Sequence, residues 1–148
     1  MERSELIGVL LSWASHLSGY TYPDSIPRIE QRPAAFFEQQ VCAGRKRCEV
    51  VAWYDDQGVI YLDDRIDDIE DPLIRSVLVH ELVHYLQDLS GEFTRNDCEE
   101  KMRRERQAYA IQRSYLNRIA GLFAATWPVY APCPAEPGAE HGDDTVDS

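Results

Sequence analysis

A His-Glu-x-x-His sequence inside an apolar run constrains this chain more than any other feature. Residues 73–89 are mostly apolar, and His80, Glu81 and His84 lie near the middle of that run. Two histidines four residues apart in a helix lie one turn apart on the same face, with Cβ atoms about 6 Å apart. Two imidazoles at that spacing can hold one zinc ion. Glu81 lies about 100° around the helix from His80, so its carboxylate can lie beside the metal and accept a proton from metal-bound water.

The signals at the two ends of this run predict a helix. Asp71 can cap its start, Pro72 fits the first helical position, and Gly91 follows its end. The segment is apolar almost all round, which is typical of a buried helix. Two histidines and a glutamate inside a buried helix need polar partners, because unpaired buried polar groups are costly. A metal ion with a bound water would satisfy all three, and the alternative is a structural pair satisfied by protein groups.

A third metal ligand must come from another segment, because catalytic zinc takes three protein ligands and keeps one open position. Residues 97–120 are predicted to form a helix, and Glu105 lies on its apolar face, seven residues from Cys98. The other members of that face are Met102, Ala108, Tyr109, Tyr115, Leu116, Ile119 and Leu122. A lone carboxylate on a buried stripe is unusual unless it is paired or bound to a metal. Glu105 is therefore the candidate third ligand, and the alternative is a surface ion pair with a neighbouring arginine.

His-Glu-x-x-His at residues 80–84, followed on the next predicted helix by Glu-x-x-Ala at residues 105–108, resembles the gluzincin branch of the zincin metallopeptidases. By its size the chain is similar to a single-domain minigluzincin, and the resemblance covers mainly residues 59–112. It implies an α+β, zincin-like single domain in which a small β-sheet or hairpin packs on the buried His-Glu-x-x-His helix and a Glu-bearing helix follows. Many gluzincins have an aspartate one turn after the ligand glutamate, where this chain has Tyr109, whose hydroxyl could donate a hydrogen bond. The family's additional transition-state donors match no residue here.

The resemblance implies a zinc-dependent metallopeptidase that hydrolyses a peptide or protein substrate. His80, His84 and Glu105 would hold zinc, and Glu81 would act as the general base toward the zinc-bound water. The alternative is a catalytically inactive zinc-binding or interaction module, for which a closed fourth ligand position would be typical. Metal-assisted hydrolysis of a substrate other than a peptide is a third interpretation.

Length and composition favour one globular domain. The chain has 148 residues, of which 44% are hydrophobic and 28% charged, and it is long enough to bury a sizeable core. A net charge of −11 argues against nucleic acid as a partner, and no apolar run is long enough to predict a membrane span. We expect residues 1–127 to form the zincin-like domain and residues 128–148 to form a Pro-rich acidic tail that is extended or disordered.

The chain has four cysteines, Cys42, Cys48, Cys98 and Cys133. An even count suits two disulfides, with three connectivities to consider. Cys42 and Cys48 are close in sequence, and Cys133 could join the C-terminal segment to the helix start at Cys98. Two disulfides would indicate a periplasmic or secreted protein. The alternative is four free thiols in a cytoplasmic protein.

The remaining segments predict a sheet and further helices. We expect helices at residues 4–18 and 33–43, a short strand at residues 28–31, and strands at residues 49–54 and 59–62. The sequence Asp-Asp-Gln-Gly at residues 55–58 is typical of a hairpin turn between the last two strands. Either hairpin strand could lie at an edge and bind an extended peptide through backbone hydrogen bonds. Residues 63–71 are acidic, and we expect a solvated loop there, with a cation site or a cleft for basic substrates as the alternatives.

Overall fold

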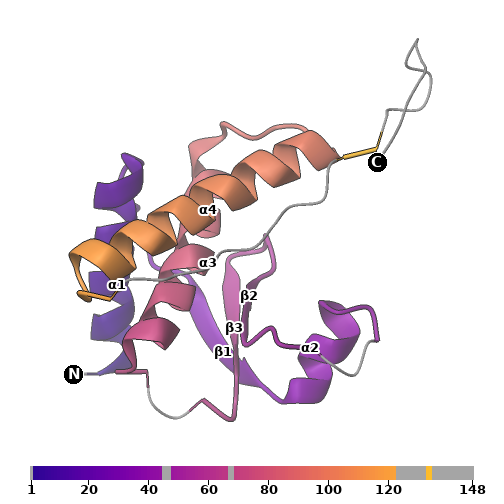
Figure 1. The fold of residues 1–148 in the computed structure, drawn as a ribbon, viewed down its shortest axis with the longest axis horizontal. Helices are drawn as coiled ribbons and strands as arrows, with labels where there is room; N and C mark the ends of the chain where they lie inside the picture. The colour runs from indigo at the N-terminus through magenta and orange to yellow at the C-terminus, as the bar shows by residue number, and fades with distance from the viewer. Residues whose placement is uncertain (1, 45–47, 67–68, 123–132, 135–148) are drawn as a thin grey trace.

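The computed structural model describes residues 2–44, 48–66, 69–122 and 133–134. These residues form four helices and one three-stranded sheet, which is consistent with the expected α+β class (Figure 1). The elements are α1 (Arg3–Ser18), β1 (Arg28–Arg32), α2 (Ala34–Gln40), β2 (Ala52–Tyr54), β3 (Val59–Asp63), α3 (Pro72–Ser90) and α4 (Cys98–Arg118). The expected elements are all present, but β2 begins at Ala52 rather than at residue 49, and α2 ends at Gln40 rather than at residue 43.

The sheet places one strand of the predicted hairpin at an edge. The strand order is β1-β3-β2, with β1 parallel and β2 antiparallel to β3. In the hairpin turn, the Asp55 side chain accepts hydrogen bonds from the backbone N–H groups of Gln57 and Val59. Gly58 has φ 83°, a left-handed conformation that glycine adopts without strain. The turn therefore brings β3 back alongside β2 and leaves the other side of β2 next to α3.

Helix α3 lies at the centre of the fold, between α1, α4 and the sheet (Figure 1). One core joins these elements, and Leu11 of α1, Leu82 of α3 and Ala108 of α4 are fully buried in it. The apolar pattern of residues 73–89 predicted a buried helix, but Leu73 and Leu89 are each 56% exposed. They lie in the first and last turns, so burial applies to the middle of α3, which carries the two histidines.

Both of the last two helices begin with an aspartate cap. The Asp71 side chain accepts a hydrogen bond from the N–H of Leu73 at 2.9 Å, and the Asp97 side chain accepts one from the N–H of Glu100 at 2.9 Å. Gly91, with φ 72°, follows the last residue of α3, as the sequence predicted. These caps satisfy N–H groups that have no partner inside a helix, and so they define where each helix starts.

The acidic segment at residues 63–71 is only partly a solvated loop. Asp63 is 1% exposed and accepts hydrogen bonds from the Arg65 guanidinium. Those hydrogen bonds outweigh the effect of burial and hold the pKa of Asp63 below its ordinary value. Asp71 caps α3 at the other end, and residues 67–68 lie outside the described residues. The two ends of the segment therefore have structural roles, which corrects the expectation of a solvated loop throughout.

Two disulfides join Cys42 to Cys48 and Cys98 to Cys133. This is the connectivity that the spacing of the cysteines favoured, and two disulfides are typical of extracellular or periplasmic proteins. No helix in the described part of the chain is long and apolar enough to cross a membrane. Apart from residues 133–134, the predicted tail lies outside the described residues, so its disorder stays a prediction.

Candidate metal centre

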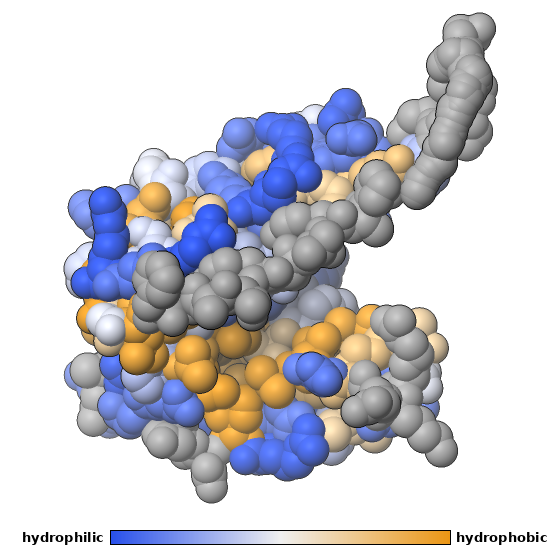
Figure 2. All heavy atoms as spheres, viewed as in Figure 1, coloured by the Kyte–Doolittle hydropathy of each residue, from blue (hydrophilic) through white to orange (hydrophobic). Residues whose placement is uncertain are grey.

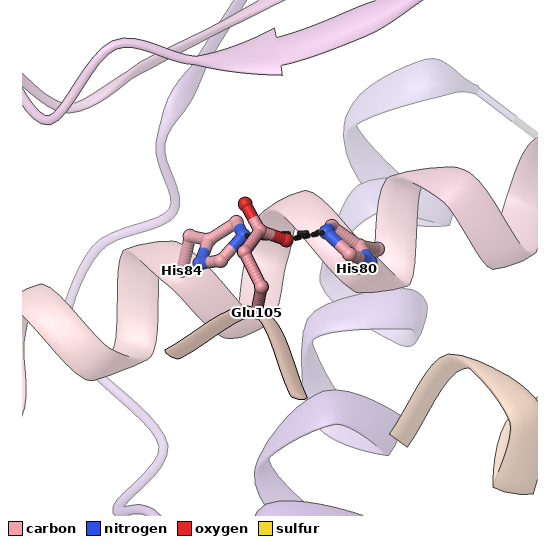
Figure 3. A group of neighbouring side chains, drawn as sticks. All are labelled: His80, His84 and Glu105. Atoms are coloured by element: carbon pink, nitrogen blue, oxygen red, sulfur yellow. Dashed lines mark hydrogen bonds and ion pairs between the residues drawn. The ribbon is translucent and has the colours of Figure 1, made fainter. Parts of the chain in front are cut away.

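Three of the four predicted site residues meet between α3 and α4. His80 and His84 project from α3, and Glu105 reaches them from α4 (Figure 3). Glu105 Oε1 lies 3.0 Å from His80 Nε2 and 3.4 Å from His84 Nε2, and the two Nε2 atoms are 3.2 Å apart. Both histidines are buried, whereas the Glu105 side chain is 39% exposed. Among the described residues, this cluster is the one group of three potential metal ligands whose donor atoms converge.

The other ring nitrogen of each histidine contacts a glutamine that sequence analysis did not single out. His80 Nδ1 lies 3.0 Å from Gln112 Oε1, and His84 Nδ1 lies 2.8 Å from Gln87 Oε1. An amide oxygen only accepts hydrogen bonds, so each Nδ1 atom carries a hydrogen. The sequence does contain a signal for both glutamines. Gln87 follows His84 by three residues and Gln112 follows Glu105 by seven, spacings that place each glutamine on the site face of its helix.

Glu81 lies beside the cluster rather than within it. Its Oε1 atom accepts a hydrogen bond from the backbone N–H of Tyr54 in β2 at 2.9 Å. Its Oε2 atom lies 4.0 Å from His80 Nε2. Burial raises the pKa of Glu81, and the charges of the two histidines only partly oppose that effect. One oxygen is therefore held by the strand, and the other faces the convergent donors.

The charges of the cluster suit a cation. Burial raises the pKa of Glu105, but hydrogen bonds from His80 and His84 outweigh it and hold that pKa below its ordinary value. Burial lowers the pKa of His84, but the hydrogen bond to Glu105 and the charges of Glu81 and Glu105 outweigh it and raise that pKa. A carboxylate anion and two imidazoles thus share a small volume in which a positive charge is favoured.

Tyr109 contacts the site through its ring. The ring packs edge-on against the His80 imidazole, with centroids 4.3 Å apart and an interplanar angle of 66°. The sequence suggested that the Tyr109 hydroxyl could take the place of a supporting aspartate. At His80 Nδ1 the observed partner is Gln112, which follows Glu105 by two turns of α4 rather than one.

The cluster lies on the wall of a cleft of about 590 Å³. Helices α3 and α4 form one side, and strand β2 with the segment before it forms the other. In Figure 2, hydrophobic residues gather on the lower half of the visible face, below the mostly hydrophilic surface over α4. The cleft residues from the strand side are Glu49, Val50, Val51, Ala52, Trp53 and Tyr54.

Comparisons with known proteins give a family but no activity. The model of a family described as "Domain of unknown function (DUF6647)" matches residues 1–133. No curated protein sequence matches the chain. Among solved structures, the chain is similar to the metallopeptidase zymogen of Pyrococcus abyssi abylysin, with 20% sequence identity and a TM-score of 0.37, covering 80% of this chain and 99% of that one. A similarity of this size does not establish a shared activity.

Proposed function

The chain belongs to the DUF6647 family, whose description assigns no function, and we propose that it is a zinc-dependent metallopeptidase of the gluzincin type. The observation that carries the proposal is the convergence of His80, His84 and Glu105 on the wall of a cleft, with Glu81 beside them. Residues 1–127 would form the peptidase domain, and a peptide or protein would be its substrate.

The chemistry of the donor set fits zinc. When both rings are neutral, the hydrogen on each Nδ1 atom leaves a lone pair on each Nε2 atom. Two lone pairs that face each other at 3.2 Å repel, and a cation between them removes the repulsion. Two histidines and one glutamate are also the ligands of well-characterised catalytic zinc sites. Zinc held by His80, His84 and Glu105 would supply an acidified water and a positive charge beside the substrate carbonyl.

Glu81 has the position and the environment of a general base. Tyr54 N–H holds one carboxylate oxygen, and the second oxygen faces the convergent donors. A carboxylate with a raised pKa is a stronger proton acceptor than an exposed one. Glu81 would take a proton from the attacking water and deliver it to the leaving amine.

Strand β2 offers a place for an extended substrate. The backbones of Val51 and Asp55 form hydrogen bonds to β3. Because the pairing alternates along an antiparallel strand, Ala52 and Tyr54 direct their backbone groups away from β3, toward the cleft side. Tyr54 N–H is the group that holds Glu81. A peptide added along this edge would therefore lie next to the base.

The number of donors favours an enzyme over a non-catalytic zinc module. A structural zinc site closes with four protein ligands, whereas a catalytic one has three and an open position. In the described part of the chain, three donors converge, and they line an open cleft. This arrangement leaves room for water and substrate.

The test combines metal content with peptide hydrolysis. Purified wild-type protein is expected to contain about one zinc per chain and to cleave members of a peptide library. Glu81→Gln should keep the zinc while turnover falls about 10²- to 10⁴-fold, because the base is lost. His80→Ala should lose both zinc and turnover.

A matched control is Glu99→Gln, which changes an exposed glutamate in the first turn of α4. It should leave zinc content and turnover unchanged. Equal turnover in Glu81→Gln and wild type would exclude the proposed mechanism. A protein that binds zinc in full but cleaves no peptide would instead be the non-catalytic module.

A further inference from the structure

Two buried glutamines flank the histidine pair, one from each site helix. Gln87 of α3 is fully buried and Gln112 of α4 is 9% exposed. A buried amide is costly unless its oxygen and its nitrogen both find partners. The histidines account for the two oxygens, so the partners of the nitrogens determine which way each amide faces.

The surroundings of Gln87 allow one orientation of its amide. Gln87 Nε2 lies 3.0 Å from the backbone oxygen of Arg104, which can only accept a hydrogen bond. Arg104 Nε, which can only donate, lies 3.3 Å from Gln87 Oε1. Exchanging the amide oxygen and nitrogen would place an acceptor against an acceptor and a donor against a donor. Gln87 Oε1 therefore faces His84 Nδ1.

Gln112 is oriented by a serine on α3. Gln112 Nε2 lies 3.1 Å from Ser76 Oγ, and the Ser76 hydroxyl donates to the backbone oxygen of Leu73 at 2.7 Å. Because the serine proton is used by Leu73, Ser76 Oγ accepts from the Gln112 amide. Gln112 Oε1 therefore faces His80 Nδ1.

We infer that Gln87 and Gln112 are positioning residues that hold both histidines in the tautomer with the hydrogen on Nδ1, without adding charge. In the neutral rings both Nε2 lone pairs then point toward Glu105 before any metal ion arrives. The inference rests on the proposed zinc site and names the side chains that prepare it. Outer partners of this kind orient ligand rings and strengthen metal binding.

The amide also does what a carboxylate could not do at position 87. Each amide links α3 to α4 while it contacts its histidine ring. Gln87 of α3 donates to the Arg104 carbonyl of α4, and Gln112 of α4 donates to Ser76 of α3. A carboxylate at position 87 would keep the contact of one oxygen with Arg104 Nε but would place its second oxygen against the Arg104 carbonyl and Gln107 Oε1. At position 112 a carboxylate is tolerated, because the Ser76 hydroxyl can rotate and donate to it.

The experiment measures zinc affinity and histidine tautomers of the full chain. Zinc affinity is determined by competition with a chromogenic chelator for wild type, Gln112→Met and Gln112→Glu. Gln112→Met keeps the length of the side chain but lacks the acceptor, and its affinity should fall about 10- to 100-fold. Gln112→Glu restores the acceptor and should bind zinc at least as tightly as wild type.

Gln39→Met is the control, since Gln39 is an exposed glutamine of α2 that does not line the cleft. Its zinc affinity should match wild type. Gln87→Glu should bind more weakly than Gln112→Glu, because of the carbonyl that faces its side chain.

Nitrogen-15 spectra of the zinc-free wild-type protein, under alkaline conditions in which both rings are neutral, report the tautomers directly. Hydrogen on Nδ1 of both rings is expected, with a mixture at His80 in Gln112→Met. Hydrogen on Nε2 in wild type, or unchanged zinc affinity in Gln112→Met, would overturn the inference. If wild type binds no zinc, the proposed function fails, and the spectra still decide the role of the glutamines.

Discussion

Helices α3 and α4 meet at the candidate metal centre but contribute to it in different ways. Helix α3 is apolar and buried through its middle, and it carries His80, Glu81 and His84 within five consecutive residues. Helix α4 is rich in charged residues and is buried along one stripe, from which Glu105 and Gln112 reach the histidines. The donors on α3 are fixed relative to one another by helix geometry alone, whereas the donor on α4 depends on how the two helices pack.

That packing is held by specific contacts. Ala108 is fully buried in the core beside α3, and a side chain as small as alanine allows a close approach of the two helices. The Gln87 amide donates to the Arg104 carbonyl, and the Gln112 amide donates to Ser76. Substitutions on α3 should therefore affect zinc binding through the lost metal ligand itself. Substitutions on α4 should affect it both through the ligand and through the register between the two helices.

The largest effect is expected from removing donors. His84→Ala should abolish zinc binding. This loss is larger than the decrease in zinc affinity of about 10- to 100-fold that is expected when a hydrogen-bond partner of a ligand is changed. Glu105→Ala should lower zinc content strongly but leave the histidine pair able to bind weakly. Metal content of the purified variants, measured by mass spectrometry, distinguishes the two. Full zinc retention in Glu105→Ala would remove α4 from the site and with it the gluzincin assignment.

The next effect is expected from the disulfide that begins at the first residue of α4. Replacing Cys98 and Cys133 by serine opens a loop with a sequence separation of 35 residues, against 6 for Cys42 and Cys48. Chain entropy predicts a loss of about 4 kcal/mol for the longer loop and about 2 kcal/mol for the shorter one. Urea unfolding of the two double variants measures the difference. Equal losses would contradict the prediction that the longer loop stabilises the protein more.

A smaller effect is expected from enlarging a residue between the helices. Ala108→Leu should cost about 1–3 kcal/mol of stability through overpacking, and it should weaken zinc binding by moving Glu105 away from the histidines. Ala110→Leu is the matched control, because Ala110 is exposed on the same helix. Thermal unfolding and chelator competition give the two quantities. Unaltered zinc affinity in a destabilised Ala108→Leu protein would show that the spacing of the helices is not critical.

The smallest effect is expected at the helix ends. Asp71→Ala and Asp97→Ala should each cost about 1 kcal/mol, because each removes one side-chain hydrogen bond to a first-turn N–H group. Zinc content should be unchanged in both, since the caps lie two or more turns from the donors. Loss of zinc from either variant would mean that the ends, and not only the middles, of the helices hold the site together. Asp64→Ala, at an exposed acidic position, is the control.

What the sequence by itself determined is local. The spacing of His80 and His84, the Asp71 cap, the stop at Gly91 and the hairpin turn before β3 follow from helix periodicity and from hydrogen bonds between near neighbours. Glu105 could also be identified as a candidate ligand from the sequence of one predicted helix, because it is a lone carboxylate on an apolar stripe.

The tertiary structure decided which of these residues meet and what supports them. It exposes Leu73 and Leu89 at the ends of an apolar helix, places β2 at the edge of the sheet, brings Gln112 to His80, and brings the Arg104 carbonyl to Gln87. A glutamine in a helix has no preferred partner until a second helix packs at a particular register and distance. Packing between elements far apart in the sequence, and not local periodicity, therefore sets the tautomers and the charge of the candidate site.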